Sequence, residues 1–278
     1  MTSLTFTLVV LTISLLAGLL GALTGLGGGV VVVPALTLAL GVDMKYAIGA
    51  SLVSVIATSS GAAAAYVREG FSNIRIGMFL EIATTMGAIL GAYLTSRVST
   101  HALAVVFGLV LLQAAYLSFK GAPEDAERVE SDALAQRLRM GGSYPVAGTP
   151  KAYGVRNVPG GFSLMFGAGA LSGLLGIGSG AVKVIAMDRV MRIPFKVSTT
   201  TSNFMIGVTA AASAGLYFHS GYINPQIAMP VMLGVATGAL VGAKLLVHMN
   251  VKTLRTIFGF VILALAIEMI VSGIAGKV

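Results

Sequence analysis

Two copies of one glycine-rich stretch decide the fold: residues 25–36 read GLGGGVVVVPAL, and residues 176–187 read GIGSGAVKVIAM. In each copy, a long apolar segment leads into the glycines. A short apolar piece follows them, at 30–41 and at 181–191. At 1.5 Å per residue this piece reaches only about 18 Å, which is too short to cross a bilayer. We therefore expect two glycine-broken helices at membrane depth.

The two stretches belong to a duplication of almost the whole chain. A shift of 151 positions aligns one half with the other without a gap. Composition alone would align leucines, but the matches include Gly18 with Gly169, Lys45 with Lys196, Ser51 with Ser202, Thr58 with Thr209, Asn73 with Asn224 and Gly87 with Gly238. Paired short segments at matching places in two halves indicate the binding site of a secondary transporter.

Composition places the chain in the membrane class. Of its residues, 56% are hydrophobic and 10% are charged, whereas charged residues make up about a quarter of a soluble domain. Long apolar segments, each of about 20 residues and so able to cross a bilayer, occupy 5–24, 46–67, 76–97, 101–119, 197–218, 226–248 and 253–275. The predicted fold class is all-α transmembrane, because frequent Gly and Ala suit closely packed helices. Each half has about four full spans plus one short, re-entrant-like segment.

The distribution of positive charge predicts the topology. The net charge of +8 comes mostly from Lys and Arg in short clusters beside apolar segments, which are orientation signals and not a nucleic-acid surface. If the short pieces do not cross, these charges divide almost evenly between the two sides. If they do cross, nearly all of them fall on one face. We therefore predict two inverted repeats, 1–119 and 161–278, joined by a cytoplasmic linker at 120–160, with both termini outside.

The linker and the N-terminus carry smaller signals. Pro123, the acids after it and the basic pair Arg137 and Arg139 predict a short amphipathic helix that Gly141 and Gly142 end. The N-terminal segment has no basic region, so we do not expect a cleaved signal peptide. The absence of cysteine excludes disulfides, thiolate metal sites and cysteine nucleophiles.

The glycine clusters are the first candidate site. They do not form a phosphate loop, because no Lys-Ser/Thr pair follows the glycines. Close helix packing is the alternative, and it fits the glycines at four-residue spacing around Gly87 and Gly238. Irregular backbone at membrane depth, however, survives only inside protein or beside a water-filled cavity. We therefore predict substrate contact for Gly27, Gly28, Gly29, Gly178, Ser179 and Gly180.

The polar start of the next helix in each half is the second candidate. It contains Ser51 in the first half, and Thr200, Thr201, Ser202 and Asn203 in the second. Free N–H groups at a helix N-terminus can bind an anion. The alternative is plain N-capping, but one cap does not need so many polar residues in a row.

Two charged side chains lie within apolar segments. Lys183 falls in the second short piece, opposite Val32 in the repeat. A lysine inside a membrane costs about 2.5–3.5 kcal/mol, so we expect it to face a cavity or a partner unless it reaches a nearby interface. Glu81 is a candidate for proton coupling, with pairing to a basic residue as the alternative. We find no metal-ligand spacing and no nucleophile motif, so no metal, cofactor or enzymatic activity is expected.

The doubled stretch, trailed by Ser202 and Asn203, resembles the TauE/SafE sulfite exporter family over nearly the whole chain. This resemblance implies a multi-pass bacterial or archaeal permease of the cell (inner) membrane for sulfite, sulfoacetate or another organosulfur anion, driven by the proton gradient. The chain departs from the pattern at Ser179, where glycine is expected, and at Ile185, where proline is expected. These departures predict a smaller kink in the second half, and they leave the substrate open between sulfite and another anion.

The sequence therefore predicts a secondary transporter that exports a small anion, sulfite or another sulfur-containing anion, by proton-coupled alternating access. A passive anion channel and a permease for a non-sulfur carboxylate are the alternatives. The expected partners are the small anionic substrate and the lipid bilayer, with a homodimer left open and with no nucleic acid.

Overall fold

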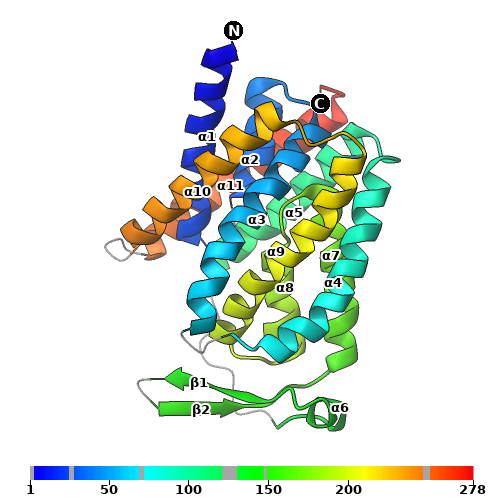
Figure 1. Ribbon diagram of the computed structural model, residues 1–278, viewed down its shortest axis with the longest axis vertical. Coiled ribbons are helices and arrows are strands. Elements are labelled where there is room, and N and C mark those ends of the chain that lie inside the picture. Colours follow the sequence, from blue (N-terminus) through cyan, green and yellow to red (C-terminus); the bar gives the residue numbers. More distant parts are fainter. Residues whose placement is uncertain are drawn as a thin grey trace.

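The computed structural model describes residues 3–24, 28–68, 72–120, 130–146, 149–246 and 251–277. The first half contains α1 (Ser3–Thr24), α2 (Gly29–Pro34), the π-helical turn η1 (Ala35–Ala39), α3 (Met44–Arg68), α4 (Ile74–Thr95) and α5 (Thr100–Lys120). The second half contains α7 (Val158–Leu175), α8 (Gly180–Ile185), the π-helical turn η2 (Ala186–Val190), α9 (Phe195–His219), α10 (Pro225–Leu246) and α11 (Val251–Ile274). Figure 1 shows these helices gathered into one bundle.

The all-α membrane class is confirmed. Each of the seven long apolar segments forms a helix whose ends lie within two residues of the expected ones. Within the described residues, three helices are long and apolar enough to cross a membrane by length and composition: α4, α7 and the part of α10 from Pro225 to Gly242. The outer face of α4 is apolar as well, since Met78, Ile82 and Met86 are more than half exposed. Such a surface suits lipid better than water.

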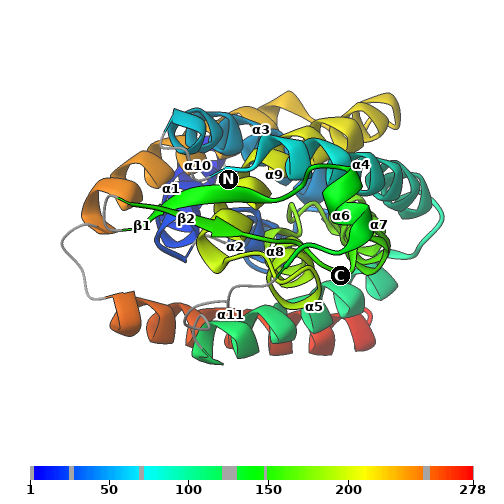
Figure 2. The ribbon, with the colours of Figure 1, turned by 90° about the horizontal axis from the view of Figure 1, so that it is seen from below.

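Helices of one half pack against helices of the other. The pairs are α1 with α10, α4 with α7, α3 with α9 and α5 with α11, and Figure 2 shows the last pair as a separate layer along one edge. Gly87 on α4 lies against the carbonyl of Phe166 on α7, and its equivalent Gly238 on α10 lies against the carbonyl of Leu15 on α1. A Cβ would collide at both places, so close packing explains these two glycines.

Two of these pairs join equivalent helices of the repeat, and both pairs run antiparallel. Gly49, near the start of α3, lies against Tyr222 beyond the end of α9, whereas Ser59 farther along α3 contacts Gly207 within α9. In the second pair, Gly108 on α5 lies against α11 at Ala266. Gly273, near the end of α11, lies against the start of α5. The two helices of each pair therefore run in opposite directions.

The interrupted helices have the same design in both halves. In each one, six residues of α-helix pass into five residues of π-helix, at Pro34–Ala35 in the first half and at Ile185–Ala186 in the second. The transition occurs at the same place with isoleucine as with proline, and the smaller kink expected at Ile185 stays a prediction. Single π-helical turns inside helices are frequent at functional sites.

The linker differs from the prediction. The described part of it forms the short helix α6 (Ala133–Arg137) and an antiparallel hairpin of β1 (Gly142–Val146) and β2 (Thr149–Tyr153). Asp132 caps α6 by accepting a hydrogen bond from the Ala135 backbone. The predicted helix start at Pro123 lies outside the described residues. The hairpin was not predicted; it lies beneath the helix bundle in Figure 1, and helix α7 begins at Val158.

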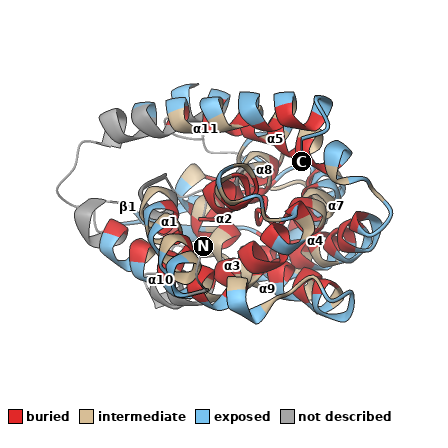
Figure 3. Cartoon of the chain, turned by 90° about the horizontal axis from the view of Figure 1, so that it is seen from above, coloured by how far each residue is buried: buried red, intermediate tan, exposed pale blue. Residues whose placement is uncertain are grey.

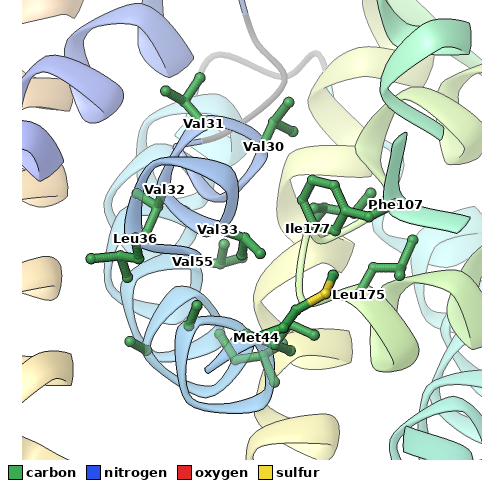
Figure 4. Close-up of a cluster of buried hydrophobic side chains, with 14 of the residues drawn as sticks. Val30, Val31, Val32, Val33, Leu36, Met44, Val55, Phe107, Leu175 and Ile177 are labelled. Atoms are coloured by element: carbon green, nitrogen blue, oxygen red, sulfur yellow. The ribbon is translucent and has the colours of Figure 1, made fainter. Parts of the chain in front are cut away.

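The core surrounds the short helices. Figure 3 shows buried positions concentrated between the helices and exposed positions on their outer faces. Four valines of α2 are buried, and they belong to a cluster that includes Phe107 of α5 and Ile177 of the second glycine stretch. Figure 4 shows these two residues next to each other and facing α2. The glycine-broken segments are therefore at the centre of the protein.

Candidate functional site where the two interrupted helices meet

The two halves touch at the glycine stretches. The Ser51 hydroxyl on α3 donates a hydrogen bond of 2.8 Å to the carbonyl of Gly176. Gly29, at the start of α2, packs against both of these groups, and a Cβ there would collide with the Ser51 hydroxyl. Glycine is thus required at position 29 because a side chain from α3 and a backbone from the other half approach it. The structure brings these predicted residues together, and their contact with substrate stays a prediction.

The second glycine stretch is a left-handed turn. Gly176 and Gly178 have φ values of +68° and +69°, and Ser179 follows at +44°. Glycine adopts this region without penalty, whereas a residue with a Cβ pays roughly 1–2 kcal/mol. The Ser179 hydroxyl is also buried without a hydrogen-bond partner in the described part of the chain. The departure from the family pattern at Ser179 therefore places both strain and an unpaired polar atom beside the start of α8.

The remaining glycines have different surroundings. Gly180 accepts a hydrogen bond of 3.3 Å from the Ser202 hydroxyl through its carbonyl, so this contact stays within the second half. Gly28 is buried against Val235 of α10 and does not face the second glycine stretch. Gly27 lies outside the described residues.

The helix N-terminus argument is wrong for the polar residues after the short segments. Helix α9 begins at Phe195 and α3 begins at Met44, so Ser51 and the run from Thr200 to Asn203 lie more than one turn inside their helices. Their backbone N–H groups are used by the helix and are not free to bind an anion. The hydroxyl of Thr200 likewise returns to its own helix, at 2.9 Å from the carbonyl of Lys196.

Thr201 and Asn203 have different roles. The Thr201 hydroxyl accepts a hydrogen bond of 3.0 Å from the backbone N–H of Asn73 at the corner between α3 and α4. Asn73 also donates to the Tyr153 hydroxyl on the hairpin at 2.8 Å. Burial raises the pKa of the Tyr153 phenol, and the bond to Asn73 opposes that rise. This chain of contacts joins the linker to α9. Asn203 is half-buried.

Lys183 is fully buried, so it does not reach an interface. Its Nζ donates a hydrogen bond of 2.6 Å to the hydroxyl of Thr209 on α9. The Thr209 hydroxyl lies 2.7 Å from Oε1 of Glu81 on α4 and donates to it. Thr85 donates to the same oxygen at 3.2 Å. The cation and the carboxylate are therefore joined through one threonine, and the pairing predicted as the alternative role of Glu81 is present in this indirect form.

The second carboxylate oxygen of Glu81 is unpaired. Glu81 is 6% exposed, and its Oε2 atom is buried with no hydrogen-bond partner within the described residues. A buried polar atom without a partner is costly. A proton placed on Oε2 would not compete with the hydrogen that Thr209 donates to Oε1. The geometry is therefore compatible with a group that accepts and releases a proton.

Sequence reasoning missed Thr209. It was noted as the partner of Thr58 in the repeat, and it lies two turns beyond Ser202, on the same side of α9. The hydroxyl of Thr58 bonds only within its own helix in the described structure, to the carbonyls of Ser54 at 3.0 Å and Val55 at 3.2 Å. The repeat positions of Lys183 and Glu81 in the other half hold Val32 and Met232. The charged network therefore occurs once, whereas the backbone plan occurs twice.

The described residues contain no group of three His, Cys, Asp or Glu side chains that could hold a metal ion.

Comparisons with known proteins agree with a transporter. The probable membrane transporter protein YunE of Bacillus subtilis is 28% identical over 96% of this chain and 98% of its own length. A probable membrane transporter protein of Xylella fastidiosa is 27% identical over 91% of this chain and 92% of its own.

Another Bacillus subtilis relative, the probable membrane transporter protein YdhB, is 27% identical over 85% of this chain and 89% of its own length.

The comparison with protein families agrees with these relatives. No solved structure matches the chain. The model of the family described as sulfite exporter TauE/SafE matches residues 10–269. Its members and these relatives are membrane transporters and not enzymes. The chain therefore belongs to the TauE/SafE sulfite exporter family, as a multi-pass membrane transporter.

Proposed function

We propose that this protein exports a small sulfur-containing anion, sulfite or an organosulfonate, by proton-coupled alternating access. The observation that carries the proposal is the position of Lys183, a fully buried cation on one of the two interrupted helices. An anion that leaves water loses its hydration, and a cation in a low-dielectric interior offsets part of that loss. The neighbouring glycine backbone and Ser179 hydroxyl supply further polar groups.

Glu81 is the proton-coupling group in this proposal. It is buried, it is linked to Lys183, and its Oε2 atom is unpaired within the described residues. Buried acids inside membrane helices commonly belong to proton pathways. Glu81→Gln should abolish the stimulation of transport by a pH gradient, while exchange of anion for anion across the membrane should persist.

Alternating access would come from movement of two inverted repeats about the site. The antiparallel packing of α3 on α9 and of α5 on α11 supports this arrangement, because inverted repeats place equivalent helices in opposite directions. The excess of Lys and Arg near one face supports a cytoplasmic linker and an inner-membrane location.

Cysteine labelling tests the topology, since the chain has no native cysteine. Ala133 on α6 and Ser220 beyond the end of α9 are both exposed. In intact cells, an impermeant maleimide should label Ser220→Cys and should label Ala133→Cys only after the membrane is opened. Labelling of Ala133→Cys in intact cells would overturn the proposed orientation.

Flux measurements test the substrate and the coupling. Purified protein in liposomes should transport sulfite, thiosulfate, sulfoacetate or taurine, and an imposed pH gradient should raise the rate. A flux of the same anions that ignores the pH gradient would favour the passive channel. A flux confined to simple carboxylates would favour the non-sulfur permease.

A further inference from the structure

We propose that Thr209 is a positioning residue that makes the proton on Glu81 and the anion at Lys183 bind together. This inference rests on the proposed function and deepens it, because it assigns the coupling to one hydroxyl group. The Thr209 side chain stands between the two charged groups, which come from opposite halves of the chain.

The hydroxyl of Thr209 has two acceptors within reach but only one hydrogen. Glu81 Oε1 lies at 2.7 Å, and the carbonyl of Met205, one turn earlier on α9, lies at 2.9 Å. A lone pair of the same hydroxyl accepts from Lys183 at 2.6 Å. The hydroxyl can therefore donate to Glu81 when that group is a carboxylate, and can turn to Met205 when it is not. Its contact with Lys183 is kept in both orientations.

Charge balance links these two orientations to the anion. With Glu81 ionised, its negative charge compensates Lys183 through Thr209. With a proton on the unpaired Oε2, Lys183 becomes an uncompensated buried cation, which is unfavourable unless another anion neutralises it. The proton and the substrate anion therefore favour each other, because one negative charge of the anion replaces the charge that Glu81 loses. Coupling of this kind is reciprocal between the two ligands.

Within the described residues, no further charged group acts on Glu81 or Lys183, and the charges of the adjoining turn η2, Asp188 and Arg189, pair with each other at 3.6 Å. Lys183 is the charged group that acts on Glu81, and Glu81 is the one that acts on Lys183. The other side chains around the carboxyl are the hydroxyls of Thr84, Thr85 and Thr209. Helix α7, which packs on α4, has no titratable side chain. On α9, Tyr217 is committed to Thr95 at 2.9 Å, and Lys196 lies at the other end of the helix.

Calorimetry of anion binding tests the inference on the whole protein in detergent. The probe is sulfoacetate near neutral pH, because both of its acid groups stay ionised there and any proton taken up must come to the protein. The heat of binding, measured in buffers of different ionisation enthalpy, gives the number of protons bound with each anion. We expect uptake approaching about one proton per anion in the parent, as strong reciprocal coupling requires.

Three variants separate positioning from structure. Thr209→Val should lower the proton uptake to less than half of the parent value and should flatten the pH dependence of sulfoacetate affinity. Thr209→Ser keeps the hydroxyl and should restore both. Thr58→Val removes the equivalent hydroxyl of the other half, which touches no charged group, and should leave both unchanged. Thermal unfolding of each variant confirms that it is folded.

The outcomes distinguish the two proposals. Unchanged uptake in folded Thr209→Val would overturn the role of Thr209 and leave the proposed function standing. Sulfoacetate binding without proton uptake in the parent would overturn the role of Thr209 and the proton coupling assigned to Glu81, and would leave the protein an anion transporter. Failure of the parent to bind either sulfoacetate or sulfite would overturn both.

Discussion

The two interrupted helices have the same backbone structure but differ in the charge of one buried side chain. In both, α-helix passes into π-helix at equivalent residues, and in both the side chain three positions after the helix start is fully buried. That side chain is Val32 in the first half and Lys183 in the second. The difference teaches that the two halves share the backbone of the interrupted helix, whereas only the second half places a positive charge on it. A site built in this way can hold one ion without needing a second at the symmetric position.

The largest expected effect is on stability, because removal of one charge leaves the other buried. Lys183→Met should lower the free energy of unfolding by about 3–5 kcal/mol, the usual cost of breaking a buried ion pair from one side. The double variant Lys183→Met with Glu81→Gln should recover most of that loss, since it leaves no uncompensated charge. Denaturant or thermal unfolding in detergent measures both. A double variant as unstable as the single one would show that the two groups do not compensate each other.

A smaller effect is expected on anion affinity. Lys183→Met should weaken sulfoacetate binding about tenfold to a hundredfold, because a hydrogen bond to a charged group contributes about 1.5–3 kcal/mol. Lys183→Arg should keep part of the affinity. Val32→Met puts the same side chain at the symmetric position and should leave affinity close to that of the parent. Equal affinity in the parent and in Lys183→Met would show that Lys183 has only a structural role. The anion would then have to be bound by uncharged hydrogen-bond donors.

The long helices could be predicted from the sequence, and the charged network could not. Apolar runs of bilayer length and the matched glycines indicate the helices and their repeat directly, because both depend on local composition. The bond between Thr209 and Glu81 joins residues 128 positions apart. A threonine in an apolar helix ordinarily bonds to its own backbone, as Thr58 does, so the type of residue gives no sign of a partner on another helix.

The two other differences have local causes. The N-terminus of α9 was predicted too far along the chain, near Thr200. The helix begins at Phe195 because Pro194 ends the preceding turn. The hairpin was missed because each strand is only five residues long and contains a proline, Pro145 or Pro150, which is unusual inside strands. The hairpin is joined to the start of α4 by the hydrogen bond from Asn73 to Tyr153, a contact between residues 80 positions apart that only the folded chain provides.

The smallest expected effect separates the two equivalent serines. Ser51 crosses between the halves to the Gly176 carbonyl at 2.8 Å, whereas Ser202 reaches Gly180 within its own half at 3.3 Å. Ser51→Ala should lower the free energy of unfolding by about 1 kcal/mol, the net value of a typical hydrogen bond. It should also change the transport rate, because the proposed alternating access would move the two halves that this bond joins. Ser202→Ala loses a longer bond within one half, so its effect on stability should be smaller. Unfolding in detergent and flux into liposomes compare the two variants, and a larger effect from Ser202→Ala on both would mean that the halves are not held together at the glycine stretches.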